Sequence, residues 1–233
     1  MRTQRFAFLA VFFFSGCWYV EGNGTRREEG RSGADFSAVY NDGSLDVLVE
    51  RGDTFAITVS IDENLLDHVD THVSGGTLYI SSHGVLRHVV SGPHVRVTLP
   101  HLLSARVSGS GRTDAMSFVE TAPVDLRVSG SGQLDFEGSA PQLTASVSGS
   151  GDLTLQGSAQ RLDATVSGSG TLDARQVSAS SAGLEASGSG DLTATVNGPV
   201  DVRVSGSGDI DVFGAAVVAS SHVRGSGDFR LHP

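Results

Sequence analysis

A Ser-Gly-Ser-Gly tetrapeptide recurs through the second half of the chain and constrains its fold more than any other sequence feature. Six copies begin at Ser108, Ser129, Ser148, Ser167, Ser187 and Ser205, and a seventh reads Arg224-Gly225-Ser226-Gly227. Successive copies are 21, 19, 19, 20, 18 and 19 residues apart. A period this regular indicates a stack of equivalent structural units.

Apolar and polar side chains alternate around each tetrapeptide. In one repeat, Leu162, Ala164 and Val166 share their parity with Gly168 and Gly170, and the residues between them are polar. Period two predicts a strand with one buried and one exposed face, and a strand this long must bend. We therefore predict an all-β parallel β-solenoid with about seven C-terminal rungs of roughly 19 residues. The glycines should lie inside each bend, with the serines in outward ladders.

The region before the repeats predicts less regular β-structure. Residues 45–49, 55–61 and 95–99 alternate as strands do, whereas residues 62–72 favour a short helical turn. We assign residues 35–233 to one solenoid domain. Its irregular N-terminal β portion covers residues 35–103, and the repeats cover residues 104–233.

The N-terminus has the pattern of a lipoprotein signal peptide. Arg2 and Arg5 precede an apolar run, residues 6–14, that is too short to span a bilayer. Phe14-Ser15-Gly16-Cys17 resembles the lipobox of bacterial lipoproteins, in which the cysteine is acylated. We predict a signal peptide over residues 1–16, and a lipidated Cys17 with a flexible tether over residues 17–34. Because Cys17 is the only cysteine, an internal disulfide is excluded.

The lipobox resemblance also implies a location. Trp18 replaces the Asp that lipoproteins retained at the inner membrane carry at this position. An outer-membrane lipoprotein, facing the periplasm or the cell surface, is therefore expected. Acylation at the N-terminus would make the membrane its first partner.

The order of motifs from residue 35 onward resembles one known family. Asp62-Glu63-Asn64-Leu65-Leu66 is followed by Gly76-Thr77-Leu78-Tyr79-Ile80, and then by repeats of the form Val-Ser-Gly-Ser-Gly-Asp-Leu. This order is similar to that of the auto-transporter adhesin, head GIN domain family of bacterial envelope proteins. The resemblance implies a β-solenoid envelope domain of unsettled function, with no catalytic residues to carry over.

Aspartates that directly follow the tetrapeptide are the metal-site candidates of the repeats. Asp191, Asp209 and Asp228 occupy consecutive rungs, so their carboxylates should stack roughly 4.8 Å apart. Such stacked carboxylates must be solvated, protonated or share a cation. Calcium is therefore a possible cofactor, although it needs six to eight oxygen ligands. Solvated aspartates at the bends are the other interpretation, and they imply no metal and no cofactor.

Histidines and the rung pattern bear on catalysis. His68 and His72 are four residues apart, which on a helix would place both on one face as a metal pair, but no further zinc ligands accompany them. Parallel β-helix enzymes that act on polysaccharides build a groove from long loops. The rungs here are uniform, so we predict no catalytic residues and no enzyme activity.

Net charge excludes one class of partner. The chain has 16 basic and 26 acidic residues, a formal charge of −10, so binding to nucleic acid is disfavoured. We expect a non-catalytic, membrane-anchored envelope module that acts in adhesion, surface interaction or envelope structure, with a glycan or a protein as ligand. The alternative is a calcium-dependent module that binds or cleaves carbohydrate. The sequence leaves the oligomeric state open.

Overall fold

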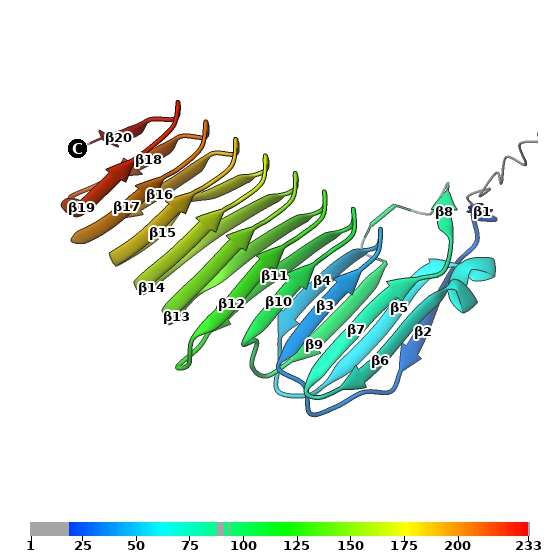
Figure 1. The fold of residues 1–233 in the computed structure, drawn as a ribbon. Helices are drawn as coiled ribbons and strands as arrows, with labels where there is room; N and C mark the ends of the chain where they lie inside the picture. Colours follow the sequence, from blue (N-terminus) through cyan, green and yellow to red (C-terminus); the bar gives the residue numbers. More distant parts are fainter. Residues whose placement is uncertain (1–18, 88–90, 93, 233) are drawn as a thin grey trace, which may run out of the picture.

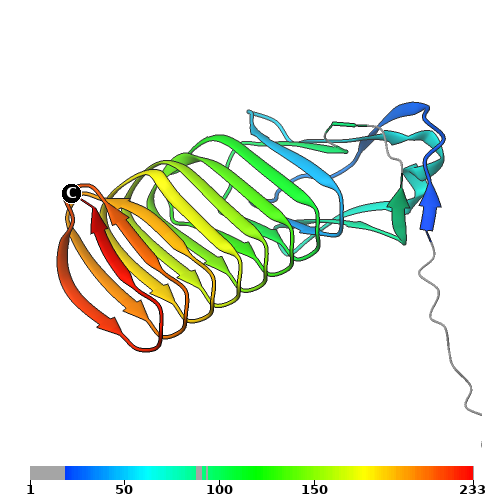
Figure 2. The ribbon, with the colours of Figure 1, turned by 90° about the horizontal axis from the view of Figure 1, so that it is seen from above.

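The computed structural model describes residues 19–87, 91–92 and 94–232. Cys17 and the expected signal peptide lie outside the described residues. The described chain is almost entirely β-structure and winds into an elongated stack of coils (Figures 1 and 2). Each coil of the repeat region has a strand in one layer, a corner at the Ser-Gly-Ser-Gly motif, and a strand in a second layer. We call these layer A, before the corner, and layer B, after it.

Both layers run the length of the stack. Layer A comprises, in stacking order, β6 (Val69–Ser74), β7 (Thr77–Ser82), β3 (Ala38–Asp42), β10 (Ser104–Val107), β12 (Val124–Val128), the second halves of β13 (Gln133–Val147), β14 (Asp152–Val166) and β15 (Thr171–Ala186), then β17 (Pro199–Val204) and β19 (Val217–Val223). Layer B comprises β2 (Arg26–Arg31), β5 (Ala56–Asp62), β9 (Val95–Leu99), β4 (Asp46–Arg51), β11 (Arg112–Val119), the first halves of β13 to β15, β16 (Leu192–Val196), β18 (Ile210–Phe213) and β20 (Phe229–His232).

Successive coils of the repeat region pair in parallel and with little change of register. From Gln133–Asp152 to Val147–Val166, residues of β13 pair with residues of β14 nineteen positions later. The long strand β13 pairs with β11 through its first half and with β12 through its second half, so it continues from one layer into the other. The predicted parallel β-solenoid is therefore confirmed. Its register also aligns equivalent repeat positions in columns.

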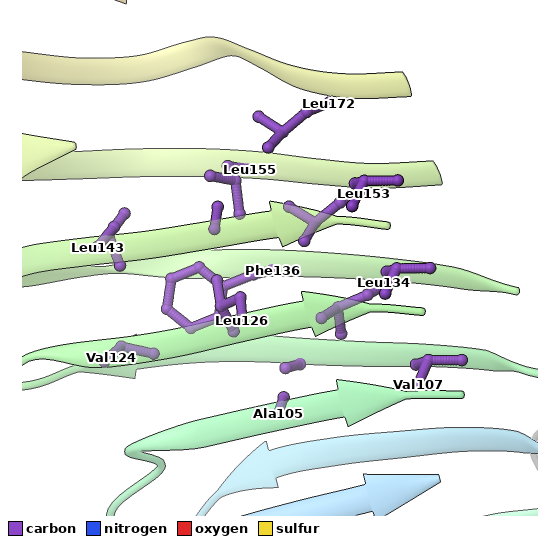
Figure 3. Packing of buried hydrophobic residues seen from close by; sticks show 14 of the residues in the cluster. Ala105, Val107, Val124, Leu126, Leu134, Phe136, Leu143, Leu153, Leu155 and Leu172 are labelled. Atoms are coloured by element: carbon purple, nitrogen blue, oxygen red, sulfur yellow. The ribbon is translucent and has the colours of Figure 1, made fainter. Parts of the chain in front are cut away.

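The core is built from such columns of aliphatic side chains. Leu134, Leu153 and Leu172 form one column, and each is at most 1% exposed (Figure 3). Phe136 fills the space beside them and is buried to the same degree. Full burial of one such side chain contributes roughly 1.5–3 kcal/mol. The strict alternation of the sequence is thus explained, because each inward residue packs on its counterparts in the neighbouring rungs.

Glycines are required at the corners because the rungs lie so close together there. A Cβ atom on Gly149 would overlap the carbonyl oxygen of Gly130, and one on Gly168 would overlap that of Gly149. The same carbonyl of Gly149 accepts hydrogen bonds from the N–H groups of Ser169, at 3.0 Å, and Gly170, at 3.1 Å. The prediction of inward glycines and outward serines is confirmed. Most corner glycines do not have a positive φ, so close approach of the rungs, rather than a left-handed backbone, demands glycine here.

The N-terminal portion is more regular than the tetrapeptides alone predicted. Val107 pairs with Asn41 and Arg112 with Asp46, so Gly43-Ser44 takes the place that Gly109-Ser110 has in the first repeat. Strands β7 and β9 add a further parallel rung beyond β3 and β4, with β7 in layer A and β9 in layer B. Only then does the pattern change, because β6 pairs antiparallel with β7 and β5 pairs antiparallel with β9.

A short 3₁₀-helix, η1 (Glu63–His68), follows β5 and forms the helical turn expected in residues 62–72. It buries Leu65 and Leu66 at the N-terminal end of the stack. Of the described residues, none belongs to a helix that is both long enough and apolar enough to cross a membrane.

The prediction of a flexible tether over residues 17–34 is wrong for its described part. Strand β2 pairs antiparallel with β5, and β1 (Tyr19–Glu21) pairs with β8 (Val85–Arg87). Between them, the Gly24 N–H donates to Asp62 Oδ1 at 2.5 Å. The sequence of β2, Arg-Arg-Glu-Glu-Gly-Arg, gave no strand signal because β2 is an edge strand with a mostly exposed face. Such a strand is held by backbone pairing, and charged side chains suit it.

Candidate functional site

The three candidate calcium ligands lie on consecutive rungs, as predicted. Asp191 Oδ1 accepts the Asp209 N–H at 3.1 Å, and Asp209 Oδ1 accepts the Asp228 N–H at 2.8 Å. Arg230 then lies 2.9 Å from both Asp209 Oδ2 and Asp228 Oδ2. The backbone N–H of Asp228 and the Arg230 guanidinium hold the pKa of the Asp209 carboxyl below its usual range. These carboxylates therefore link the rungs to one another and to an arginine.

No group of three or more His, Cys, Asp or Glu side chains placed to hold a metal ion occurs within the described parts of the chain. Calcium binding at Asp191, Asp209 and Asp228 stays a prediction. The helical histidine pair does not form, because His68 ends η1 whereas His72 lies in β6. His72 instead stacks on Tyr79, with ring centroids 5.0 Å apart and ring planes 8° apart.

A groove on the outer face of layer A gathers aromatic, cationic and hydroxyl side chains. It has a volume of about 520 Å³ and crosses β7, β3, β10, β12 and β13. Its lining includes Tyr40, Tyr79, Arg106 and Arg127. The hydroxyl groups that line it belong to Thr77, Ser104, Ser129, Ser146 and Ser148.

In-register pairing brings the two tyrosines and two arginines together. Tyr79 pairs with Tyr40, Tyr40 with Arg106, and Arg106 with Arg127. Each of the four occupies the same position in its rung, with its neighbours in the column roughly 4.8 Å away. Because Leu78, Val39, Ala105 and Leu126 on the opposite parity are buried, these four point outward. We call Tyr79, Tyr40, Arg106 and Arg127 the Tyr-Arg column.

The aromatic end of the Tyr-Arg column is fixed by ring contacts. Tyr79 packs edge-on against Tyr40, with ring centroids 5.7 Å apart and planes at 78°. His72 covers Tyr79 on the other side by stacking. Aromatic pairs of this geometry contribute about 0.5–1.5 kcal/mol beyond the area that they bury. The rings therefore present a preformed surface to the groove.

The cationic end of the column carries more positive than negative charge. Arg106 Nη2 lies 3.2 Å from Asp125 Oδ2, and Arg127 Nε lies 3.0 Å from both Asp125 oxygens. One carboxylate thus serves two guanidinium groups, and both arginine side chains remain about half exposed, at 50% and 52%. A local excess of one positive charge results on a chain whose formal charge is −10.

One hydroxyl in the groove lacks a hydrogen-bond partner within the described structure. Ser104 Oγ is buried, lines the groove and has no partner there. A buried polar group without a partner costs about 1–3 kcal/mol. The accessible side chains of the groove offer hydroxyl groups, cations and apolar ring surfaces to one bound molecule.

The Tyr-Arg column was not predicted from the sequence, although a signal for it exists. Arg106 and Arg127 each stand two residues before the first serine of a tetrapeptide. Tyr40 stands at the same offset before Asp42-Gly43, which had not been recognised as a corner. Aligning Gly43 with the repeat glycines would have placed Tyr40 next to Arg106.

Comparison with known proteins agrees with this architecture. Residues 35–216 match the family described as "Putative auto-transporter adhesin, head GIN domain". The chain belongs to this family. It is thus an adhesin-like head GIN domain, as its motif order indicated. No curated protein matches the chain.

Solved bacterial structures share the fold of this head GIN domain. A putative adhesin from Bacteroides fragilis matches with a TM-score of 0.81 at 18% identity, over 91% of this chain and 99% of that one. A putative lipid binding protein from Parabacteroides distasonis matches with a TM-score of 0.74 at 23% identity, over 93% of this chain and 100% of that one. A putative adhesin from the same species matches with a TM-score of 0.68 at 24% identity, over 91% and 99%. At these identities the likeness concerns the fold alone.

Proposed function

We propose that this head GIN domain is a non-catalytic adhesive module of the bacterial cell envelope, anchored to the outer membrane by acylated Cys17 and exposed to the outside. The observation that carries the proposal is the groove over the Tyr-Arg column. It is an open surface with preformed rings and half-exposed cations on a rigid stack. Surfaces with fixed aromatic and arginine side chains are typical of binding sites.

Binding rather than catalysis follows from the charges in the groove. General acid–base work needs a titratable side chain that is free to exchange a proton with the substrate. Asp125, the carboxylate beside the groove, is paired with both Arg106 and Arg127. Its role is therefore to orient the two guanidinium groups.

Anchoring is tested by a matched pair of substitutions in the lipobox. Cys17→Ala removes the acylated side chain, so the variant should appear in the soluble fraction of lysed cells. Ser15→Ala preserves the lipobox pattern and should stay with the membranes. Membrane retention of Cys17→Ala would contradict the anchor.

Exposure to the outside is tested with protease on intact cells. The protein should be digested on intact cells, as it is after lysis. Protection on intact cells, together with digestion after lysis, would place the domain in the periplasm and defeat the adhesive function.

A further inference from the structure

Resting on the proposed adhesive function, we further propose that the groove over the Tyr-Arg column binds an anionic polysaccharide whose acidic groups are sugar carboxylates. In this arrangement the carboxylates lie against Arg106 and Arg127, and the sugar rings lie toward Tyr40. The hydroxyl groups of the groove bind the sugar hydroxyls.

The arginines select a carboxylate rather than an extended anionic surface. A guanidinium group matches a carboxylate in a bidentate geometry, and the two here share one acidic partner. A membrane or a nucleic acid would present many negative charges to a chain of formal charge −10. Two neighbouring guanidinium groups suit a polymer that presents its carboxylates along a single chain rather than over a surface.

The rest of the groove suits a sugar better than a peptide. Tyrosine supplies an apolar ring surface with a polar tip, and Ser129, Ser146 and Ser148 supply hydroxyl groups along the lining. Pyranose rings have apolar faces and hydroxyl edges, which match these two features. The rung spacing of about 4.8 Å is close to the length of one pyranose in an extended chain, so successive sugars would meet successive rungs.

The C-terminal half of the same column is unsuited to this ligand and provides the control. Beyond Ser146 the column continues with Thr165, Glu185 and Arg203. These residues border a second, smaller hollow, in which Arg203 lies 3.9 Å from Glu185. Asp163 and Asp201 also line this hollow. Acidic residues outnumber arginines in this hollow, so a polyanion should be repelled from it.

The test measures binding of the full-length protein to polygalacturonate, a polymer of sugar carboxylates. The Arg106→Gln/Arg127→Gln variant should raise Kd by about tenfold or more, because both charge-assisted contacts are lost. Tyr40→Leu, which keeps apolar bulk but removes the ring, should also weaken binding. Arg203→Gln is the matched control in the same column and should bind as the wild type does. Circular dichroism should show that all variants keep their β-structure.

Three other probes decide between ligand classes. Methyl-esterified polygalacturonate keeps the rings but lacks the charge, and polyglutamate keeps the charge but lacks the rings. Both should bind at least about tenfold more weakly than polygalacturonate if the arginines and the rings act together. Vesicles with anionic lipids should not bind. Equal binding of polyglutamate or of the vesicles, or an unchanged Kd in the double arginine variant, would overturn the sugar assignment.

The outcomes separate this assignment from the adhesive function on which it rests. If cells that display the protein on their surface adhere to a substratum but polygalacturonate does not compete, the ligand class is wrong and the adhesive function stands. If intact cells protect the protein from protease, the adhesive function itself fails.

Discussion

The two ends of the solenoid are built differently although they belong to the same stack. At the N-terminal end, β5 and β6 pair antiparallel with β9 and β7, and η1 covers the core with Leu65 and Leu66. At the C-terminal end, β19 and β20 have no described strand beyond them (Figure 1). Val223 is 46% exposed there, whereas Val204, its partner one rung earlier, is 1% exposed.

This contrast shows that burial in the stack depends on the neighbouring rung and not on the residue type. Val212 is fully buried, and Leu231, its partner in the last rung, is 42% exposed. In a stack of this kind, stability is the sum of each rung's own contribution and its contacts with the next rung. The N-terminal end should therefore be the more stable one, and the last rung should open first.

The largest effect is expected from truncating a leucine at the covered end. Leu65→Ala should lower the free energy of unfolding by about 2–5 kcal/mol, because Leu65 is fully buried where η1 covers the core. Leu231→Ala makes the same truncation at the open end and should change the free energy of unfolding by less than about 0.5 kcal/mol. Urea denaturation of both variants measures the difference. Equal losses would mean that another part of the molecule or a partner covers the C-terminal rung.

A smaller effect is expected at the corners. Gly168→Ala places a Cβ against the carbonyl oxygen of Gly149 in the middle of the stack, so the rungs must separate, at a cost of about 1–3 kcal/mol. Ser167→Ala changes the exposed residue beside it and should be neutral.

Gly225→Ala creates the same kind of overlap, with the Gly206 carbonyl, in the last rung, where the φ of 114° at Gly225 adds backbone strain. With no described rung stacked beyond it, this rung can move away. Hydrogen exchange should therefore show loosening confined to β19 and β20. A global loss of protection in Gly225→Ala would contradict the expected independence of the open end.

The corners could be predicted from the sequence alone, whereas the N-terminal end of the stack could not. Alternation and a period near 19 residues determine the parallel solenoid, because only one inward parity can pack a column such as Leu134, Leu153 and Leu172. The serines and glycines of the corners were assigned correctly for the same reason. The antiparallel N-terminal end was not foreseen, since its strands carry no repeat by which to align them. Strand β2 was missed because an exposed edge strand needs no apolar pattern.

The candidate site was harder to find because it joins regular and irregular parts of the chain. Arg106 and Arg127 belong to repeats, whereas Tyr40 and Tyr79 come from strands whose register with the repeats could not be read without the corner at Gly43. Only the strand pairing places Tyr40 beside Arg106, which lies 66 residues later in the sequence. The groove lies on layer A, on a face between the corners.

The smallest expected effect concerns the charges at the open end and depends on pH. Arg230 pairs with Asp209 and Asp228, and it helps to keep the pKa of the partly exposed Asp209 carboxyl below its ordinary value of 3.8. An acid whose pKa is lowered by folding stabilises the folded state above its unfolded pKa, and this contribution is lost as the pH falls through the folded pKa. Arg230→Gln should therefore speed amide exchange in β20 at neutral pH. The difference from the wild type should vanish only as the pH falls through the lowered pKa of the folded Asp209 carboxyl, which lies below 3.8. Leu65 and the N-terminal strands should show no change, because the last rung is several coupled rungs away from them. A difference that persists in acid would mean that Arg230 acts by packing along β20 rather than through the carboxylates.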